Sequence, residues 1–294
     1  MLRGSIVAIV TPMMASDTSI DYEVLGQLID WHINEGTKGI VIVGTTGESP
    51  TVSFNEHCEL IKYAVNASQG RVPIVAGTGA NSTQEAIDLS VYAKDVGADL
   101  GLSVVPYYNK PTQEGLYEHF KAIAETVDFP QILYNVPGRT VADISNETVF
   151  RLSKIENIIG LKDATADLER FTELIDLVDR DFAIYSGDDA TALGLMMLGG
   201  HGVISVTANV VPKLLSQMCD FVFKGDWESA KEANQRLLML NKYLFAEANP
   251  IPVKWALNQM GKLPTGIRSP LTALSTKWHV PLIAGLERAG VILK

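Results

Sequence analysis

One short stretch, Ile158-Ile159-Gly160-Leu161-Lys162, indicates both the fold and the chemistry of this chain. Its continuous apolar character is typical of a strand that is covered on both faces, as in a parallel sheet. Because desolvation disfavours the ammonium form, a lysine at the end of such a strand can be uncharged and nucleophilic. The alternative is a lysine with a buried alkyl chain, whose ammonium group reaches water or pairs with Asp163.

Similar apolar runs recur along the chain, and segments with helical periodicity lie between them. The repeat of roughly 30 residues is that of a strand followed by a helix, and eight such units predict a closed (β/α)8 TIM barrel, which needs roughly 250 residues. The expected strands cover Ser5–Val10, Gly39–Val43, Pro73–Ala76, Leu100–Val105, Gln131–Asn135, Ile158–Lys162, Phe182–Ser186 and Gly202–Val206.

Helix-start signals support this alternation. Asp21 is positioned to cap one helix, while Ser53 with Glu56 and Ser82 with Glu85 match the capping-box pattern. After the last strand the pattern is purely helical. We therefore expect a catalytic barrel over residues 1–224 and a C-terminal helical segment over 225–294, with helices at 227–245, after Pro250 and Pro252, and near 282–289.

The composition limits the class of protein. The chain has 294 residues, 47% of them hydrophobic and 20% charged, with a net charge of −10, which is ordinary for a globular enzyme and argues against nucleic acid or an anionic membrane as the main partner. The N-terminal apolar run is too short for a signal peptide or a membrane span. Cys58 and Cys219 match no metal or redox motif and predict buried thiols in a reducing, cytoplasmic compartment.

Polar groups follow the expected strands at the end where TIM barrels carry their active sites. The loop 44–49 has the sequence Gly-Thr-Thr-Gly-Glu-Ser, and its backbone N–H groups and hydroxyls can bind a carboxylate. Tyr134 lies on the strand beside Lys162 and can exchange protons with its amine. Arg139 follows a Pro-Gly turn, and its guanidinium suits a second carboxylate. Taken alone, each feature is equally compatible with a structural role: a tight turn for the loop, core packing for Tyr134 and a surface ion pair for Arg139.

Other chemistries are poorly supported. Gly77-Thr78-Gly79 resembles the start of a dinucleotide-binding motif, but Ser82 stands where the third glycine is needed. No metal site is expected, because the histidines are never spaced as a ligand pair: His32, His57, His119, His201 and His279. An amine nucleophile beside a tyrosine, with two carboxylate-binding groups and no cofactor, describes a class I aldolase, which activates a keto acid as an imine.

Several motifs together resemble the dihydrodipicolinate synthases, members of the pyruvate-dependent class I aldolase superfamily that includes the N-acetylneuraminate lyases. The resemblance runs from end to end. It rests on Gly4–Pro12, Gly44–Ser49, Ala76–Asn81, Pro106–Asn109, Tyr134–Thr140, Gly160–Lys162, Ser186–Asp189 and Asn249–Lys254.

This resemblance implies a lyase that condenses pyruvate with L-aspartate 4-semialdehyde to 4-hydroxy-tetrahydrodipicolinate, at the branch point to diaminopimelate and lysine, in a homotetramer. Lys162 would form the Schiff base with pyruvate, and no other cofactor is implied. The remaining implied roles are a proton relay by Thr45, Tyr134 and Tyr108, with Tyr108 supplied across a subunit interface, pyruvate carboxylate binding by Thr46, aldehyde carboxylate binding by Arg139, and pocket lining by the main chain of Gly187 and Ile204.

The resemblance also implies a site for L-lysine as feedback inhibitor, at a subunit interface. Pro50 and Phe54 depart from it, since they stand where relatives often have small polar residues, and Asp163 stands where many relatives have glutamate. The matching effector residues are Ser49, His57, Asn81, Glu85 and Tyr107. The alternatives are a lyase of the same fold that acts on a sialic or sugar acid, a non-catalytic barrel, and a nicotinamide-dependent oxidoreductase.

Overall fold

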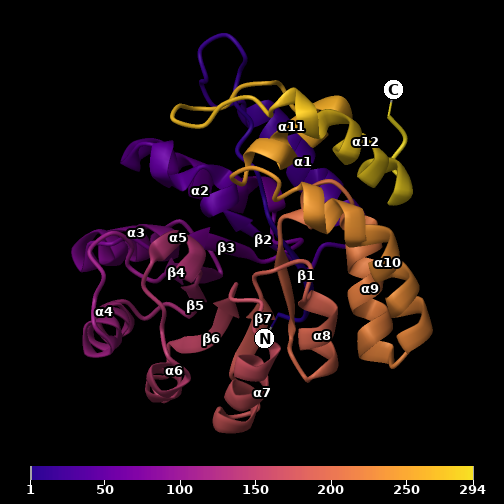
Figure 1. Cartoon of the computed structure of the whole chain (residues 1–294). Helices are drawn as coiled ribbons and strands as arrows, with labels where there is room; N and C mark the ends of the chain where they lie inside the picture. Colours follow the sequence, from indigo (N-terminus) through magenta and orange to yellow (C-terminus); the bar gives the residue numbers. More distant parts are fainter. Residues whose placement is uncertain (1, 294) are drawn as a thin grey trace.

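The computed structural model describes residues 2–293, and its centre is a closed barrel of eight parallel strands (Figure 1). The strands pair in chain order, and β8 closes the barrel on β1. The predicted (β/α)8 fold is therefore confirmed. The strands are β1 (Gly4–Ala8), β2 (Gly39–Ile42), β3 (Ile74–Gly77), β4 (Leu100–Val104), β5 (Gln131–Asn135), β6 (Ile158–Asp163), β7 (Ala183–Ser186) and β8 (Gly202–Ser205).

Helices connect successive strands around the outside of the barrel. Short 3-10 turns lie at η1 (Thr45–Gly47), η2 (Ser49–Thr51), η3 (Thr207–Asn209) and η4 (Thr276–Trp278). The helices are α1 (Tyr22–Asn34), α2 (Phe54–Ser68), α3 (Thr83–Asp95), α4 (Gln113–Thr126), α5 (Pro137–Thr140), α6 (Asn146–Leu152), α7 (Leu168–Leu177), α8 (Ala192–Met197), α9 (Pro212–Lys224), α10 (Trp227–Tyr243), α11 (Ile251–Gln259) and α12 (His279–Arg288).

The predicted helix starts are present, with one difference. The Asp21 carboxylate accepts from the Val24 amide at 3.0 Å, and Ser53 and Glu56 form a complete capping box. At Ser82 the hydroxyl accepts from the Glu85 amide, but within residues 2–293 we find no return bond in which the Ser82 amide donates to the Glu85 carboxylate. The Glu85 side chain lines a pocket instead.

Side chains fill the inside of the barrel, so the barrel is a packed core. Ile6, Val41, Val75 and Ile132 are buried there, and Tyr185 donates its hydroxyl to the Leu2 carbonyl at 2.7 Å. Close packing of this kind holds the strand ends rigidly relative to one another. Side chains at those ends can therefore form a site of fixed geometry.

The C-terminal helices pack against the barrel helices in one shared apolar core. Leu237 of α10, Leu257 of α11 and Leu282 of α12 belong to the same buried cluster as Leu25 of α1, and Figure 1 shows α10 beside α9. Gly225, with φ of 76°, separates α9 from α10. A domain boundary after residue 224 stays a prediction.

The two cysteines agree with the prediction of buried thiols. Cys58 and Cys219 are free and buried, and burial raises the pKa of both thiols. Neither is therefore an activated thiolate. Between residues 2 and 293, no helix combines the length and apolar character needed to cross a bilayer.

Candidate active site

Lys162 lies at the C-terminal end of β6, and its side chain enters a cavity at the end of the barrel. The β6 register places it between Tyr134 of β5 and Tyr185 of β7. Its Nζ lies 4.0 Å from the centroid of the Tyr134 ring, and Lys162 and Tyr134 are only 6% and 7% exposed. Among the described residues, no carboxylate forms a salt bridge with this amine. A buried amine beside a phenol is thus in place for imine chemistry.

Asp163 points away from this amine, contrary to the pairing that the sequence left open. Its carboxylate accepts from the Thr165 amide at 2.7 Å and from the Asn135 side chain at 3.1 Å. It also forms an ion pair with Arg170 at 3.2 Å. Asp163 is fully buried in this network, which anchors the end of β6 on the outer side of the barrel.

The absence of a side chain at Gly187 leaves room for the side chain of Lys162. A Cβ atom at this position would lie 3.0 Å from Lys162 Cε and 2.9 Å from Ala164 Cβ. Both separations are below ordinary carbon contact distances of roughly 3.5–4.0 Å. Gly187, which follows β7, therefore permits the close passage of the Lys162 chain into the cavity.

The cavity has a volume of about 200 Å³, which is suited to a small organic molecule. Its lining comes from several strand ends and from the C-terminal segment. The lining residues are Ala8, Val41, Gly44, Thr45, Thr46, Leu102, Tyr134, Val136, Arg139, Lys162, Ala164, Gly187, Asp188, Val206, Phe245 and Asn249.

The loop 44–49 supplies the hydroxyls of the cavity. Thr45 begins the turn η1, and Thr46 is 2% exposed. The Thr46 Oγ1 accepts from Asn249 Nδ2 at 3.0 Å, while Thr11 Oγ1 donates to the Gly47 carbonyl at 2.7 Å. Bonds from two distant segments thus fix the loop, and a preorganised loop is suited to bind a carboxylate.

Arg139 lies at the mouth of the cavity. It is in the short helix α5 and is exposed, and its Nη2 donates to the Asn249 carbonyl at 3.1 Å. The other guanidinium N–H groups have no protein acceptor in the residues that the structure describes. They are available to a carboxylate that enters from solvent.

Two of the predicted site residues lie apart from the cavity. Tyr108 is 90% exposed, has a positive φ of 74°, and does not line the cavity of its own chain. Ile204 is 1% exposed and packs inside the barrel, below the cavity, whereas Val206 contributes to the lining. The structure therefore brings together Lys162, Tyr134, Thr45, Thr46, Arg139 and Gly187, but not Tyr108 or the side chain of Ile204.

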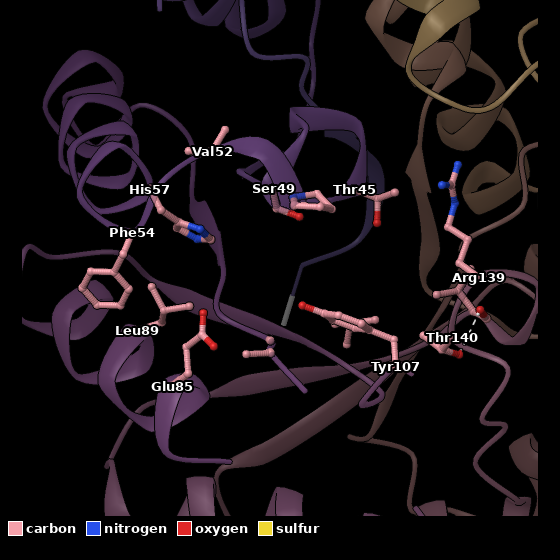
Figure 2. A pocket seen from close by; sticks show the side chains of 15 residues that line it. Thr45, Ser49, Val52, Phe54, His57, Glu85, Leu89, Tyr107, Arg139 and Thr140 are labelled. Carbon is pink, nitrogen blue, oxygen red and sulfur yellow. Dashed lines mark hydrogen bonds between the residues drawn. The ribbon is translucent and has the colours of Figure 1, made fainter. Parts of the chain in front are cut away.

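A second pocket, of about 290 Å³, contains most of the predicted effector residues. In Figure 2, Phe54, Glu85 and Leu89 lie on one side of it, Arg139 and Thr140 lie on the other, and Tyr107 extends between them. Ser49 and His57 also line this pocket. Asn81 does not line it, but its Nδ2 donates to the Tyr107 carbonyl at 3.2 Å.

The charges of this second pocket are defined by burial. His57 Nε2 lies 2.6 Å from the Gly77 carbonyl, which only accepts, so this nitrogen carries the proton. Burial lowers the pKa of His57 below its usual value. The neutral ring then leaves Nδ1 as an acceptor. Glu85 is a carboxylate on one side of the pocket, Arg139 is a guanidinium on the other, and Val52, Phe54 and Leu89 form an apolar wall, so the side around Glu85 suits an ammonium group on an alkyl chain.

Three polar or aromatic lining residues, Asn249, Asp188 and Phe245, have no role in the sequence-based prediction. Asn249 belongs to a motif that carried the resemblance without an assigned function, and Asp188 lies at a predicted strand end. Phe245 lies after α10 and shows no sequence signal that separates it from a core residue. Among residues 2–293, no cluster of three or more His, Cys, Asp or Glu side chains is arranged to bind a metal.

Comparisons with known proteins identify the family of this chain. The sequence model of the dihydrodipicolinate synthetase family matches residues 1–288. A curated relative from Nitrosospira multiformis, named 4-hydroxy-tetrahydrodipicolinate synthase, is 63% identical over 292 residues, which cover 99% of this chain and 97% of the relative. The crystal structure of chloride-inhibited dihydrodipicolinate synthase from Acinetobacter baumannii, complexed with pyruvate, has a TM-score of 0.97 and 55% identity, covering 99% of this chain and 100% of that chain. The enzyme from Cyanidioschyzon merolae with lysine bound has a TM-score of 0.96 and 39% identity, covering 99% of each chain.

Proposed function

The chain belongs to the dihydrodipicolinate synthetase family, and we propose that it uses the Lys162 amine to condense pyruvate with L-aspartate 4-semialdehyde. The protein is a lyase of the class I aldolase type, and its product is 4-hydroxy-tetrahydrodipicolinate, from which diaminopimelate and lysine are made. The observation that carries the assignment of Lys162 is its buried amine, 4.0 Å from the Tyr134 ring centroid in a cavity of about 200 Å³.

In the first half-reaction the Lys162 amine attacks the ketone carbon of pyruvate. The ketone oxygen leaves as water, and the resulting iminium withdraws electrons from the methyl group, which loses a proton to give an enamine. Tyr134, Thr45 and Tyr108 transfer the protons for these steps, with Tyr108 supplied by a neighbouring subunit in a homotetramer. The 90% exposure of Tyr108 supports a role outside its own chain. No further cofactor is needed, because the imine itself is the electron sink.

In the second half-reaction the enamine carbon attacks the aldehyde of the second substrate. The amine of that substrate then attacks the iminium carbon, which closes the ring and releases Lys162. The Thr46 hydroxyl holds the pyruvate carboxylate, Arg139 holds the carboxylate of the aldehyde, and the main chain of Gly187 and Ile204 shapes the pocket. The exposed position of Arg139 at the mouth suits the substrate that binds second.

Reductive trapping tests the nucleophile. Incubation with pyruvate and borohydride is expected to add one reduced pyruvate to the chain, and peptide mapping is expected to locate it on Lys162. Lys162→Ala should fold and lose the adduct, whereas Lys154→Ala, which removes an exposed lysine paired with Asp179, should keep it. An adduct on another residue, or no adduct on the wild-type protein, would contradict the assignment.

The main rival is a lyase of the same fold that acts on a sialic or sugar acid. Arg139 at the mouth supports a carboxylate-bearing aldehyde as the acceptor. Assays with both acceptors separate the two functions, because only the synthase forms a product with nitrogen in its ring. We also propose that the enzyme works in the cytoplasm, where its two buried free thiols would remain reduced.

The second pocket supports regulation by L-lysine. Glu85 would pair with an ammonium group, and the neutral His57 would accept a hydrogen bond from the ligand. Glu85→Gln is expected to raise the lysine concentration that gives half-inhibition, while Glu118→Gln, on the exposed face of α4, should not. An inhibition curve that stays flat to high millimolar lysine in the wild-type enzyme would rule this regulation out, and Pro50 and Phe54 would then be the first residues to exchange.

A further inference from the structure

Lys254 and Glu48 form an ion pair that is almost completely buried. Their side chains are 5% and 0% exposed, and Lys254 Nζ donates to Glu48 Oε1. Lys254 lies in α11, whereas Glu48 belongs to the loop 44–49. Burial pulls the pKa of Lys254 below its usual value, and Glu48 opposes that shift. The reaction described above uses neither residue.

Such a pair needs an explanation other than stability. Removing two charges from water costs so much that a buried ion pair is often no more stabilising than apolar side chains of the same size. A buried pair does, however, define a position, because each charge becomes costly when it loses its partner. The pair between Lys254 and Glu48 therefore fixes the loop 44–49 relative to α11.

Glu48 lies two residues after Thr46 in the loop that carries the two threonines of the cavity. Its backbone is left-handed, with φ of 60° and ψ of 34°, a conformation that residues other than glycine rarely keep unless surrounding contacts hold them. Its amide donates to the Thr45 carbonyl at 3.1 Å, and its Oε2 accepts from the Arg268 amide at 3.1 Å. Both carboxylate oxygens are thus bound by the C-terminal segment.

The same segment also holds the side chain of Thr46. Asn249, shortly before Lys254 in the chain, donates to Thr46 Oγ1 at 3.0 Å. A hydroxyl that accepts this bond has its own proton free to donate elsewhere. Because Thr46 lines the cavity, that proton is available to a pyruvate carboxylate bound there. Asn249 is 6% exposed, so water does not compete freely for this bond.

We propose that Lys254 is a positioning residue for the synthase reaction: its bond to Glu48 holds the loop 44–49 so that Thr45 and Thr46 meet pyruvate in the reactive geometry. This inference rests on the proposed role of the loop in binding pyruvate. Lys254 acts through Glu48 and does not itself touch the substrate. The C-terminal helical segment is then a working part of the active site.

Two variants separate positioning from stability. Lys254→Met leaves Glu48 charged and unpaired, so the protein should lose thermal stability and bind pyruvate poorly. The double variant Glu48→Gln/Lys254→Met has no unpaired charge and should recover thermal stability, but it has no bond between the two side chains. We expect its half-saturating pyruvate concentration in borohydride trapping to stay raised by about ten- to a hundredfold, the range for loss of a hydrogen bond to a charged group, with Lys162 still trapped at saturation.

Arg236→Met is the matched control. It removes a bond within the C-terminal segment, from Arg236 to the Ala289 carbonyl at 2.9 Å, and should leave the half-saturating pyruvate concentration unchanged. A folded double variant with wild-type half-saturation would overturn the role of Lys254, as would an equal change in the control. Absence of trapped pyruvate in the wild-type enzyme would instead refute the proposed function itself.

Discussion

Substitution of Gly187 by alanine tests whether the position of the lysine amine limits the reaction. The added Cβ would lie 3.0 Å from Lys162 Cε and 2.9 Å from Ala164 Cβ. Since carbon atoms normally stay roughly 3.5 Å or more apart, Lys162 Cε must retreat by about half an ångström. The lysine chain is flexible, whereas Ala164 Cβ can move only with its backbone. The protein should therefore fold, with a stability loss of about 1–3 kcal/mol from overpacking.

The expected effect on catalysis is larger than the effect on folding. A misplacement of 1 Å can lower a rate about 100-fold, so half that displacement predicts a decrease of about tenfold in the rate of imine formation. The assay is the time course of borohydride trapping at saturating pyruvate, with thermal unfolding measured in parallel.

Gly138→Ala is the control for this substitution. Gly138 lies one residue before Arg139, and a Cβ atom there would meet no atom within 4 Å, so trapping should proceed at the wild-type rate. If Gly187→Ala also trapped pyruvate at the wild-type rate, the position that Gly187 allows the Lys162 amine would not limit imine formation.

Three further predictions address other residues. Arg139→Ala should leave pyruvate trapping intact and lower kcat/KM for the aldehyde about ten- to a hundredfold. Arg151→Ala, which breaks an exposed pair with Glu114, should leave kcat/KM unchanged. Unchanged aldehyde kinetics in Arg139→Ala would show that Arg139 has another role. Tyr108→Phe should keep the melting temperature, because the side chain is 90% exposed, and lower kcat by about 100-fold or more; a wild-type kcat would remove Tyr108 from the relay. Burial lowers the pKa of His119 from 6.5 to about 4. As the pH falls, the imidazole therefore binds a proton in the unfolded chain before it does so in the folded protein. The free energy of unfolding consequently decreases as the pH drops from 6.5 to about 4. In urea titrations His119→Asn should lose less stability over that interval, by roughly 1 kcal/mol per pH unit, and an equal loss in both proteins would contradict the neutral buried state.

The barrel could be predicted because its signals are local. Each strand is a short, mainly apolar run that can be recognised without its partner strands. The observed strand ends differ from the predicted ones by two residues at most, as at Ala8 of β1. Helix starts are equally local, since Asp21 and Ser53 bond to amides three residues ahead. The exception at Ser82 follows from tertiary structure, because the Glu85 carboxylate lines the second pocket and does not complete the capping box.

The active-site lysine and tyrosine could be predicted for a related reason. Once strands β5 and β6 are assumed to be neighbours in a parallel barrel, Tyr134 and Lys162 come to the same end of the sheet, and the structure pairs them directly. The side of the strand is less certain from sequence. Asp163 was a possible partner of Lys162, but successive residues of a strand point to opposite faces, and Asp163 binds Arg170 on the outside of the barrel.

The contacts of Asn249 and Lys254 could not be predicted in this way. They join residues that are 203 and 206 positions apart in the chain, and no periodicity or spacing rule links α11 to the loop after β2. A sequence that places a lysine in a short helix predicts a solvated charge, whereas here Lys254 is 4% exposed. The physical signal is the pairing itself: a buried carboxylate in a left-handed turn requires a cation, and only the folded chain shows which lysine provides it.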